Sequence, residues 1–168
     1  HIRENRIAGA WSAGTTGGSL TNATANGFHG CTFETNLPYR GDNPAGYAGG
    51  YPTAFDTSGT VGVAIYLNNS YGFKVDSNCY FENHNYTVVL ANSSDSNLFH
   101  ASRFAPGGAA NVRVGGVKMV GAAVGYNTFD NVEMIGTSTT VANVEMDNAN
   151  QFYNQFINTQ GFTFITAS

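Results

Sequence analysis

The sequence predicts an all-β fold in which short parallel strands stack in successive coils, a β-solenoid. Three observations predict it: one short motif recurs along the chain, its copies keep regular intervals, and charged residues make up only 11% of the 168 residues. Surface helices normally use Glu, Lys and Ala, whereas this chain has 21 Gly and 20 Asn. The composition therefore favours strands joined by tight turns.

The recurring motif is Asn-x-Phe, followed five positions after the Phe by an apolar side chain. The asparagines that open its four copies are Asn26, Asn97, Asn127 and Asn150. The apolar residues that close them are Phe33, Phe104, Met134 and Ile157. A fifth copy keeps only the closing half, because Phe81 in "CYFEN" takes the place of Phe33 in "CTFET". We expect the asparagines to turn the chain and to stack in hydrogen-bonded ladders.

The intervals between the closing residues indicate the coil length. The interval from Phe81 to Phe104 equals the interval from Met134 to Ile157. The interval between them, from Phe104 to Met134, is longer. These intervals predict coils of about 23 residues, one of them lengthened to about 30 by an insertion in the run "APGGAANVRVGG".

A second apolar column keeps step with the first. Leu67 and Leu90 are separated by the same interval as Phe81 and Phe104. Leu90 and Val120 are separated by the longer interval, as Phe104 and Met134 are. Two columns that agree through unequal intervals indicate whole coils rather than chance apolar spacing. We expect about five to six coils, each about 4.8 Å above the last.

The interval from Phe33 to Phe81 is about twice the length of one coil. Its surplus predicts a loop inserted at about residues 37–60, where Gly and Pro are frequent. Rigid Tyr side chains stack on sugar rings at small entropic cost, so this loop is a candidate binding loop. Its candidate substrate-binding residues are Tyr39, Tyr47 and Tyr51. The alternative is a loop that packs on its own coils or on a neighbouring subunit.

Strand alternation separates inward from outward residues in each coil. The inward column two positions before the closing residues contains Cys31 and Cys79. Neighbouring coils would bring these cysteines close enough for a disulfide. The plainer alternative is two buried thiols that pack as small apolar side chains.

The outward-facing columns contain the charged and polar side chains that catalysis or ligand binding would use. We expect Arg103 beside Glu133 and His100 beside Asp130 in neighbouring coils. Paired carboxylates about 5–10 Å apart act as acid and base on glycosidic bonds. The candidate catalytic residues are Glu34, Glu82, Asp130 and Glu133. Tyr80, His100 and Arg103 are candidate substrate-binding residues, and the alternative is ordinary ion pairing on a solvated or subunit-facing surface.

Charge and composition exclude several classes of function. The net charge is −4 and the chain has only 7 Lys and Arg, which argues against nucleic-acid binding, because phosphates are bound by clustered basic side chains. No apolar run approaches the roughly 18 residues of a membrane span, so we expect no membrane insertion. No Cys/His set has zinc spacing and no Asp cluster resembles a calcium site, so we expect no metal or cofactor.

The coil motif resembles the right-handed parallel β-helix of the pectin-lyase-like superfamily, especially bacteriophage tailspikes, in which Asn-x-Phe-x-x-Cys/Val-x-Phe coils recur. The resemblance covers roughly Asn26 to the end, as a β-helix domain at residues 26–168. Residues 1–25 remain as an N-terminal segment that could form a cap. The resemblance implies single-stranded right-handed winding, a homotrimer, and a location in the virion tail or outside the cell.

The same resemblance implies a function in host recognition. A tailspike-like fragment would bind bacterial surface polysaccharide, with or without cleaving it as a glycoside hydrolase or polysaccharide lyase. The chain stops at "GFTFITAS", the beginning of a new coil, so we expect a piece of a longer protein or a protomer whose open end is covered by partners. The alternatives are a non-catalytic stem of a trimeric virion fibre and a secreted bacterial β-helix adhesin or carbohydrate-active enzyme.

Overall fold

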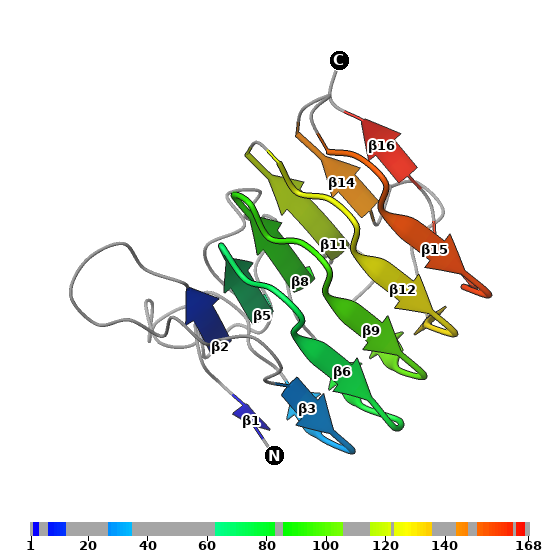
Figure 1. Cartoon of the computed structure of the whole chain (residues 1–168). Coiled ribbons are helices and arrows are strands. Elements are labelled where there is room, and N and C mark those ends of the chain that lie inside the picture. The colour runs from blue at the N-terminus through cyan, green and yellow to red at the C-terminus, as the bar shows by residue number, and fades with distance from the viewer. Residues whose placement is uncertain are drawn as a thin grey trace, which may run out of the picture.

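The computed structural model describes residues 2–3, 7–12, 27–34, 63–82, 86–105, 115–121, 123–135, 144–147, 151–162 and 164–166. Every regular element within these ranges is a strand, numbered β1 to β16 (Figure 1). No helix long and apolar enough to cross a membrane occurs among them. All the strand pairs are parallel. The prediction of an all-β fold with parallel strands is confirmed.

The strands form three parallel sheets, here called A, B and C. Sheet A contains β1 (Ile2–Arg3), β4 (Thr32–Glu34), β7 (Tyr80–Glu82), β10 (Arg103–Ala105) and β13 (Glu133–Met134). Sheet B contains β2 (Ile7–Ser12), β5 (Val63–Asn68), β8 (Tyr86–Ala91), β11 (Gly115–Val120), β14 (Val144–Met146) and β16 (Phe164–Thr166). Sheet C contains β3 (Gly27–His29), β6 (Lys74–Asp76), β9 (Leu98–His100), β12 (Thr128–Asp130) and β15 (Gln155–Ile157).

From β1 to β15 the strands occur in the order A, B, C, A, B, C, and each pairs with the next strand of its own sheet. A sixth passage begins after β15, where an isolated bridge between Glu133 and Gln160 stands in place of a sheet A strand before β16. One passage through the three sheets is called a rung below. The first rung is β1, β2 and β3, and the fifth is β13, β14 and β15. In Figure 1 the strands of sheets B and C form two rows that run from the first rung to the last. Residues of successive rungs are thereby vertical neighbours.

The intervals predicted for sheet A from Phe33 to Met134 are confirmed by its register. Phe33, Phe81, Phe104 and Met134 are successive Cα partners. All four side chains are buried, and the rings of Phe33 and Phe81 stack with centroids 4.7 Å apart. The predicted loop at residues 37–60 and the central part of the predicted insertion, residues 106–114, lie outside the described residues. This mostly aromatic column forms the centre of the core, because its stacked side chains fill the space between rungs.

A ladder of asparagines, of which Asn97 and Asn127 are buried, fixes where the third, fourth and fifth rungs enter sheet C. The Oδ1 atom of Asn127 accepts hydrogen bonds from the main-chain N–H and the Nδ2 atom of Asn97, at 3.1 and 2.8 Å. The Oδ1 atom of Asn154 accepts the same two bonds from Asn127, at 3.1 and 2.9 Å. Each Nδ2 atom also donates to a main-chain carbonyl, for example from Asn127 to Ser94. The predicted ladder is confirmed for Asn97 and Asn127, whereas Asn26 lies outside the described residues.

The predicted position of the last motif copy is wrong. "NANQFYNQF" contains Asn-x-Phe twice, and the ladder selects Asn154 rather than Asn150. The ring of Phe156 stacks on Phe129 with centroids 4.7 Å apart. Ile157, predicted to follow Met134 in sheet A, is instead the partner of Asp130 in sheet C and is 42% exposed. The hydrogen-bonded ladder and the ring column choose the register, and spacing alone could not.

The second apolar column also needs a correction of one position. Leu67 and Leu90 are partners as predicted, but Leu90 pairs with Met119 rather than with Val120. Met119 is fully buried, whereas Val120 is only partly buried. The reason is that the insertion in this rung is split between two places. Most of the inserted residues come before Gly115, and the rest lie between Val120 and the next strand, so the partner of Leu90 comes one position earlier than predicted.

Candidate functional site

The candidate site lies at the C–A corner, the turn that joins each strand of sheet C to the next strand of sheet A. Every described turn of this corner has at least one residue with a positive φ, which bends the chain sharply. These residues are Gly30 (62°), Asn78 (63°), Ala101 (47°), Asn131 (53°) and Asn158 (51°), and the turn of the second rung also has Ser77 (59°). Main-chain hydrogen bonds join successive turns, for example from Asn78 N to Ala101 O at 2.8 Å. The corner is therefore a regular column of turns whose exposed side chains are mostly amides.

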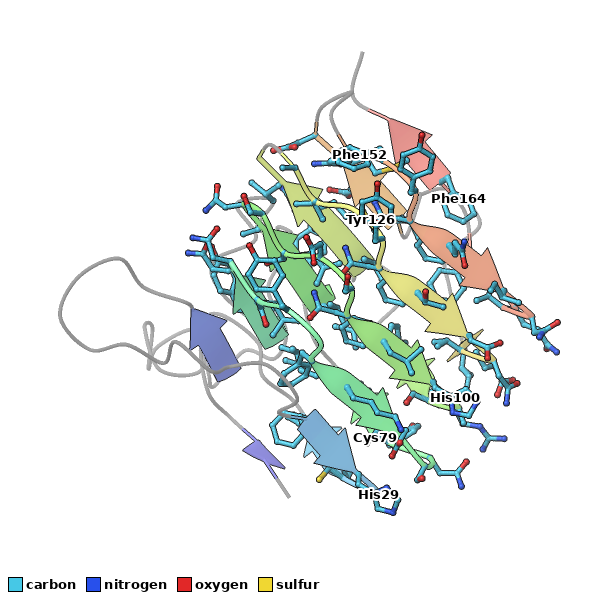
Figure 2. The ribbon with its side chains drawn as sticks, in the orientation of Figure 1. His29, Cys79, His100, Tyr126, Phe152 and Phe164 are labelled. Carbon is cyan, nitrogen blue, oxygen red and sulfur yellow. The ribbon has the colours of Figure 1, made fainter. Side chains whose placement is uncertain are left out.

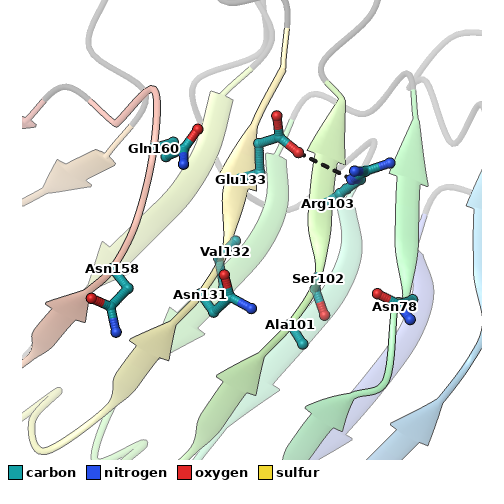
Figure 3. A pocket seen from close by; sticks show the side chains of 9 residues that line it. All are labelled: Asn78, Ala101, Ser102, Arg103, Asn131, Val132, Glu133, Asn158 and Gln160. Carbon is teal, nitrogen blue, oxygen red and sulfur yellow. Dashed lines mark ion pairs between the residues drawn. The ribbon is translucent and has the colours of Figure 1, made fainter.

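A cavity of about 220 Å³ crosses this corner between the second and sixth rungs (Figure 3). Its lining is Asn78, Ala101, Ser102, Arg103, Asn131, Val132, Glu133, Asn158 and Gln160. Four of these are primary amides, which donate and accept hydrogen bonds at once. The cavity is thus a polar, open groove suited to a ligand with many hydroxyl groups.

The predicted neighbours Arg103 and Glu133 meet in this groove. They are Cα partners on β10 and β13, and Arg103 Nε lies 3.0 Å from Glu133 Oε2. Both side chains remain substantially exposed. This contact uses Nε, and a guanidinium group carries further N–H donors on its two other nitrogens.

The predicted neighbours His100 and Asp130 lie on the sheet C side of the same corner. They are Cα partners, with His100 Nε2 at 3.8 Å from Asp130 Oδ2. Asp130 also accepts a hydrogen bond of 3.3 Å from Asn158 Nδ2. The structure therefore gathers four of the predicted site residues, two on each side of one corner, from two successive turns.

An additional charged group, which the sequence reasoning missed, continues the corner into the first two rungs. Asp76 accepts from His29 Nδ1 at 2.7 Å and from Lys74 Nζ at 2.6 Å. These contacts, chiefly the bond from Lys74 and then that from His29, lower the pKa of Asp76 from 3.8 to about 2. Phe28 pairs with Val75, and this pairing aligns the first rung with the second. The sequence did not predict it, because the second rung has no Asn-x-Phe motif to align.

The other predicted site residues lie elsewhere. Tyr80 is the Cα partner of Arg103 on the outer face of sheet A, but it does not line the groove. Glu82 is the Cα partner of both Glu34 and Ala105. The side chain of Glu34 lies outside what the structure describes, as do all the loop residues Tyr39, Tyr47 and Tyr51. Their proposed roles remain predictions.

The two cysteines are neighbours with free thiols. The main-chain N–H of Cys31 lies 3.3 Å from the Sγ atom of Cys79. Cys79 is fully buried and Cys31 is partly buried, and both are unbonded. Burial raises the pKa of the Cys79 thiol, which disfavours the reactive thiolate. Of the two predicted arrangements, the structure therefore has two packed thiols rather than a disulfide.

A second surface feature was missed at the B–C corner, the turn from sheet B into sheet C. Tyr126, Phe152 and Tyr153 form an exposed aromatic cluster there, with ring centroids 5.3 to 5.6 Å apart. The correct alignment of Asn127 with Asn154 would have found it, because a Tyr directly precedes each of these asparagines. The misplaced fourth copy of the motif separated the two tyrosines.

The groove supplies amide groups and the ion-paired carboxylate of Glu133, all of which can form hydrogen bonds with a polar ligand. Within the described residues no three His, Cys, Asp or Glu side chains are grouped closely enough to hold a metal ion. Comparison of the chain with protein-family models, with curated proteins and with solved structures finds no match. The function is therefore inferred from the geometry of the corner itself.

Proposed function

We propose that the three sheets belong to one single-stranded right-handed parallel β-helix that binds bacterial surface polysaccharide, as part of a tailspike-like protein. The repeated order A, B, C with parallel pairing between successive rungs supports the winding. The homotrimer and the location in a virion tail or outside the cell are parts of the same proposal, and they derive from the resemblance of the coil motif.

The observation that carries the binding proposal is the polar groove across the C–A corner. Its amides lie on several rungs: Asn131 and Asn158 are one rung apart, about 4.8 Å, and Asn78 lies two rungs before Asn131. A polysaccharide presents hydroxyl groups with a comparable linear repeat. The Arg103 guanidinium at the edge of the groove would pair with a sugar carboxylate or hydroxyl.

Cleavage is the extension of this proposal. Asp130 and Glu133 flank the same turn, and each is in contact with a basic side chain from the rung before. A bound glycan lying across the turn would meet both carboxylates, which is the requirement for acid and base roles on one glycosidic bond. Glu34 and Glu82 stand in register on sheet A and form the other candidate pair.

The experiment is affinity electrophoresis of the purified chain in gels that contain single O-antigen or capsular polysaccharides. We expect retardation in at least one gel, and about a tenfold weaker interaction for Arg103→Ala, because a charge-assisted hydrogen bond is lost. Thr128→Ser, on the outer face of β12 and away from the groove, is the control and should migrate as the wild type. Unretarded migration across a broad panel would refute the proposal.

The same preparation tests cleavage. Incubation with each retarding polysaccharide, followed by assays of reducing ends and unsaturated products, separates a hydrolase from a lyase. Loss of product in both Asp130→Asn and Glu133→Gln, with retardation kept, is expected if the pair is catalytic. A retarded polysaccharide that stays intact with the wild-type chain would limit the function to binding.

A further inference from the structure

The B–C corner carries a column of surface residues that is independent of the groove. Isolated parallel bridges join Tyr71, Asp95, Gly125 and Phe152, one from each of four successive rungs. The residue after each bridge has a positive φ in every one of these rungs: Gly72 (63°), Ser96 (55°), Tyr126 (55°) and Tyr153 (54°). Two aligned columns therefore run along this corner. In Figure 2 Tyr126 and Phe152 lie near the amino ends of the sheet C strands, opposite to His29 and His100.

Aromatic side chains occupy this corner in the fourth and fifth rungs. Tyr126 stacks on Tyr153 with an angle of 20° between the rings, and Phe152 meets both rings edge-on. Tyr153 is 72% exposed and Tyr126 is 55% exposed. Gly125 allows the close approach of Phe152, because a Cβ atom there would lie 2.8 Å from its main-chain oxygen and 3.0 Å from its ring.

The backbone at the two tyrosines is costly. A bulky residue with positive φ is strained, and such strain is commonly kept where a side chain has a function. The second rung has Gly72 at the equivalent position, so the turn itself does not require an aromatic residue. Their large exposure also means that these rings add little to the core. A surface role explains both observations.

The pattern along the corner fits a glycan better than a protein. Tyr71 is 43% exposed in the second rung, and the polar Asp95 and Ser96 separate it from the aromatic cluster. Protein interfaces have contiguous apolar centres that are depleted in charge. A sugar chain instead presents apolar ring faces and hydroxyl groups in alternation, which matches rings on both sides of a carboxylate.

We infer that the B–C corner is a second carbohydrate-binding site, which takes a neutral linear glycan along rungs two to five. Tyr153 and Tyr71 stack on sugar rings at the two ends, and Asp95 accepts hydroxyl hydrogen bonds between them. The carboxylate disfavours acidic sugars because like charges repel. Four rungs span about 14 Å, the length of a short oligosaccharide. This inference depends on the proposed function only for the class of ligand, since it uses none of the groove residues.

The test is affinity electrophoresis of Tyr153→Gly against gels of neutral glucans, galactans and mannans and of uronic-acid polysaccharides. We expect retardation by a neutral glycan that weakens about tenfold in this variant, since one stacking face is lost. Its melting temperature should not fall, because Gly relieves the positive φ at an exposed site. Ala123→Gly is the matched control: it relieves the same kind of backbone strain (φ 62°) without removing a ring, and it should bind as the wild type.

The pair of variants Tyr153→Gly and Arg103→Ala separates the two sites. If binding were lost in Arg103→Ala but kept in Tyr153→Gly, the result would support binding in the groove and contradict the second site. A neutral glycan whose binding depends on Tyr153 but not on Arg103 supports the second site even if the groove is inactive. Tyr71→Ser, at the other end of the corner, should weaken the same glycan. Sedimentation in which Tyr153→Gly abolishes self-association without changing glycan binding would also overturn the inference, because it would make the cluster a subunit contact.

Discussion

The C–A and B–C corners lie at opposite ends of the same short strands of sheet C, and both bend the chain with residues of positive φ. The C–A corner uses Gly, Asn and Ala at that position, whereas the B–C corner uses tyrosines in two rungs. Inside the B–C corner a buried asparagine ladder holds the rungs together. The C–A corner instead has exposed amides and ion pairs. The same residue type, Asn, therefore makes buried hydrogen bonds at one corner and presents exposed amides at the other.

The largest expected difference between the corners is in the stability lost when an asparagine is replaced. Asn127→Ala should lower the free energy of unfolding by about 3 kcal/mol, because buried partners of its amide at Asn97 and Ser94 are left unsatisfied. Asn131→Gly at the C–A corner should change it by less than about 0.5 kcal/mol, since Gly keeps the positive φ (53°) of an exposed residue. Urea unfolding measures both. Equal losses would refute the division between the corners.

A second prediction concerns the strain of the turns. Ala101→Gly should stabilise the protein by about 1 kcal/mol, because Ala101 has a φ of 47° that disfavours a side chain. The same substitution at Ala105, a buried residue in β10, should destabilise it by about 1 kcal/mol. Thermal unfolding of the two variants gives opposite signs if the positive φ is the cause. Destabilisation by both would show that the turn tolerates Ala without strain.

A third prediction uses pH. Because folding lowers the pKa of Asp76 from 3.8 to about 2, its contacts stabilise the fold fully above about pH 4 and are lost as the pH falls to about 2. Asp76→Asn should remove this part of the acid destabilisation. Melting temperatures of the wild type and the variant should therefore converge between pH 4 and pH 2. Curves that stay parallel through this range would show that Lys74 and His29 do not stabilise the carboxylate.

The smallest expected effect is that of the Arg103–Glu133 pair. With side chains 65% and 41% exposed, their coupling should be about 0.5 kcal/mol or less in a double-mutant cycle of Arg103→Gln and Glu133→Gln. Added salt should reduce it further. A coupling energy well above that value would indicate that the pair has a structural role. It would then contradict the proposal that the Arg103 guanidinium binds a ligand.

Most of the fold could be predicted because stacked rungs convert sequence intervals into contacts. Phe81, Phe104 and Met134 are partners at the intervals counted from the sequence, and the expected pairs Arg103–Glu133 and His100–Asp130 follow from the same register. Inward and outward faces followed from the period of two along each strand. The roles of the candidate catalytic residues are a separate matter, which only binding and cleavage assays address.

The errors arose where local spacing was ambiguous. In "NANQFYNQF" two asparagines precede a Phe by the same spacing, and the buried ladder through Asn154 distinguishes them. Val120 and Met119 are both apolar, and only the register with Leu90 shows which one faces the core. Each error displaced the surface residues of its rung, so the cluster of Tyr126 and Tyr153 was not found.

The sequence by itself determined that the described part of the chain forms strands, that they stack in repeated rungs, and which residues form most of the core, because periodicity and volume are properties of the residues in order. Only the tertiary structure decided which asparagines form the ladder and which tyrosines are exposed. Hydrogen bonds between rungs depend on partners that are a whole rung apart in the sequence, and their geometry is satisfied in one register alone. The surface chemistry follows that register, since a shift of one position turns every side chain to the other face.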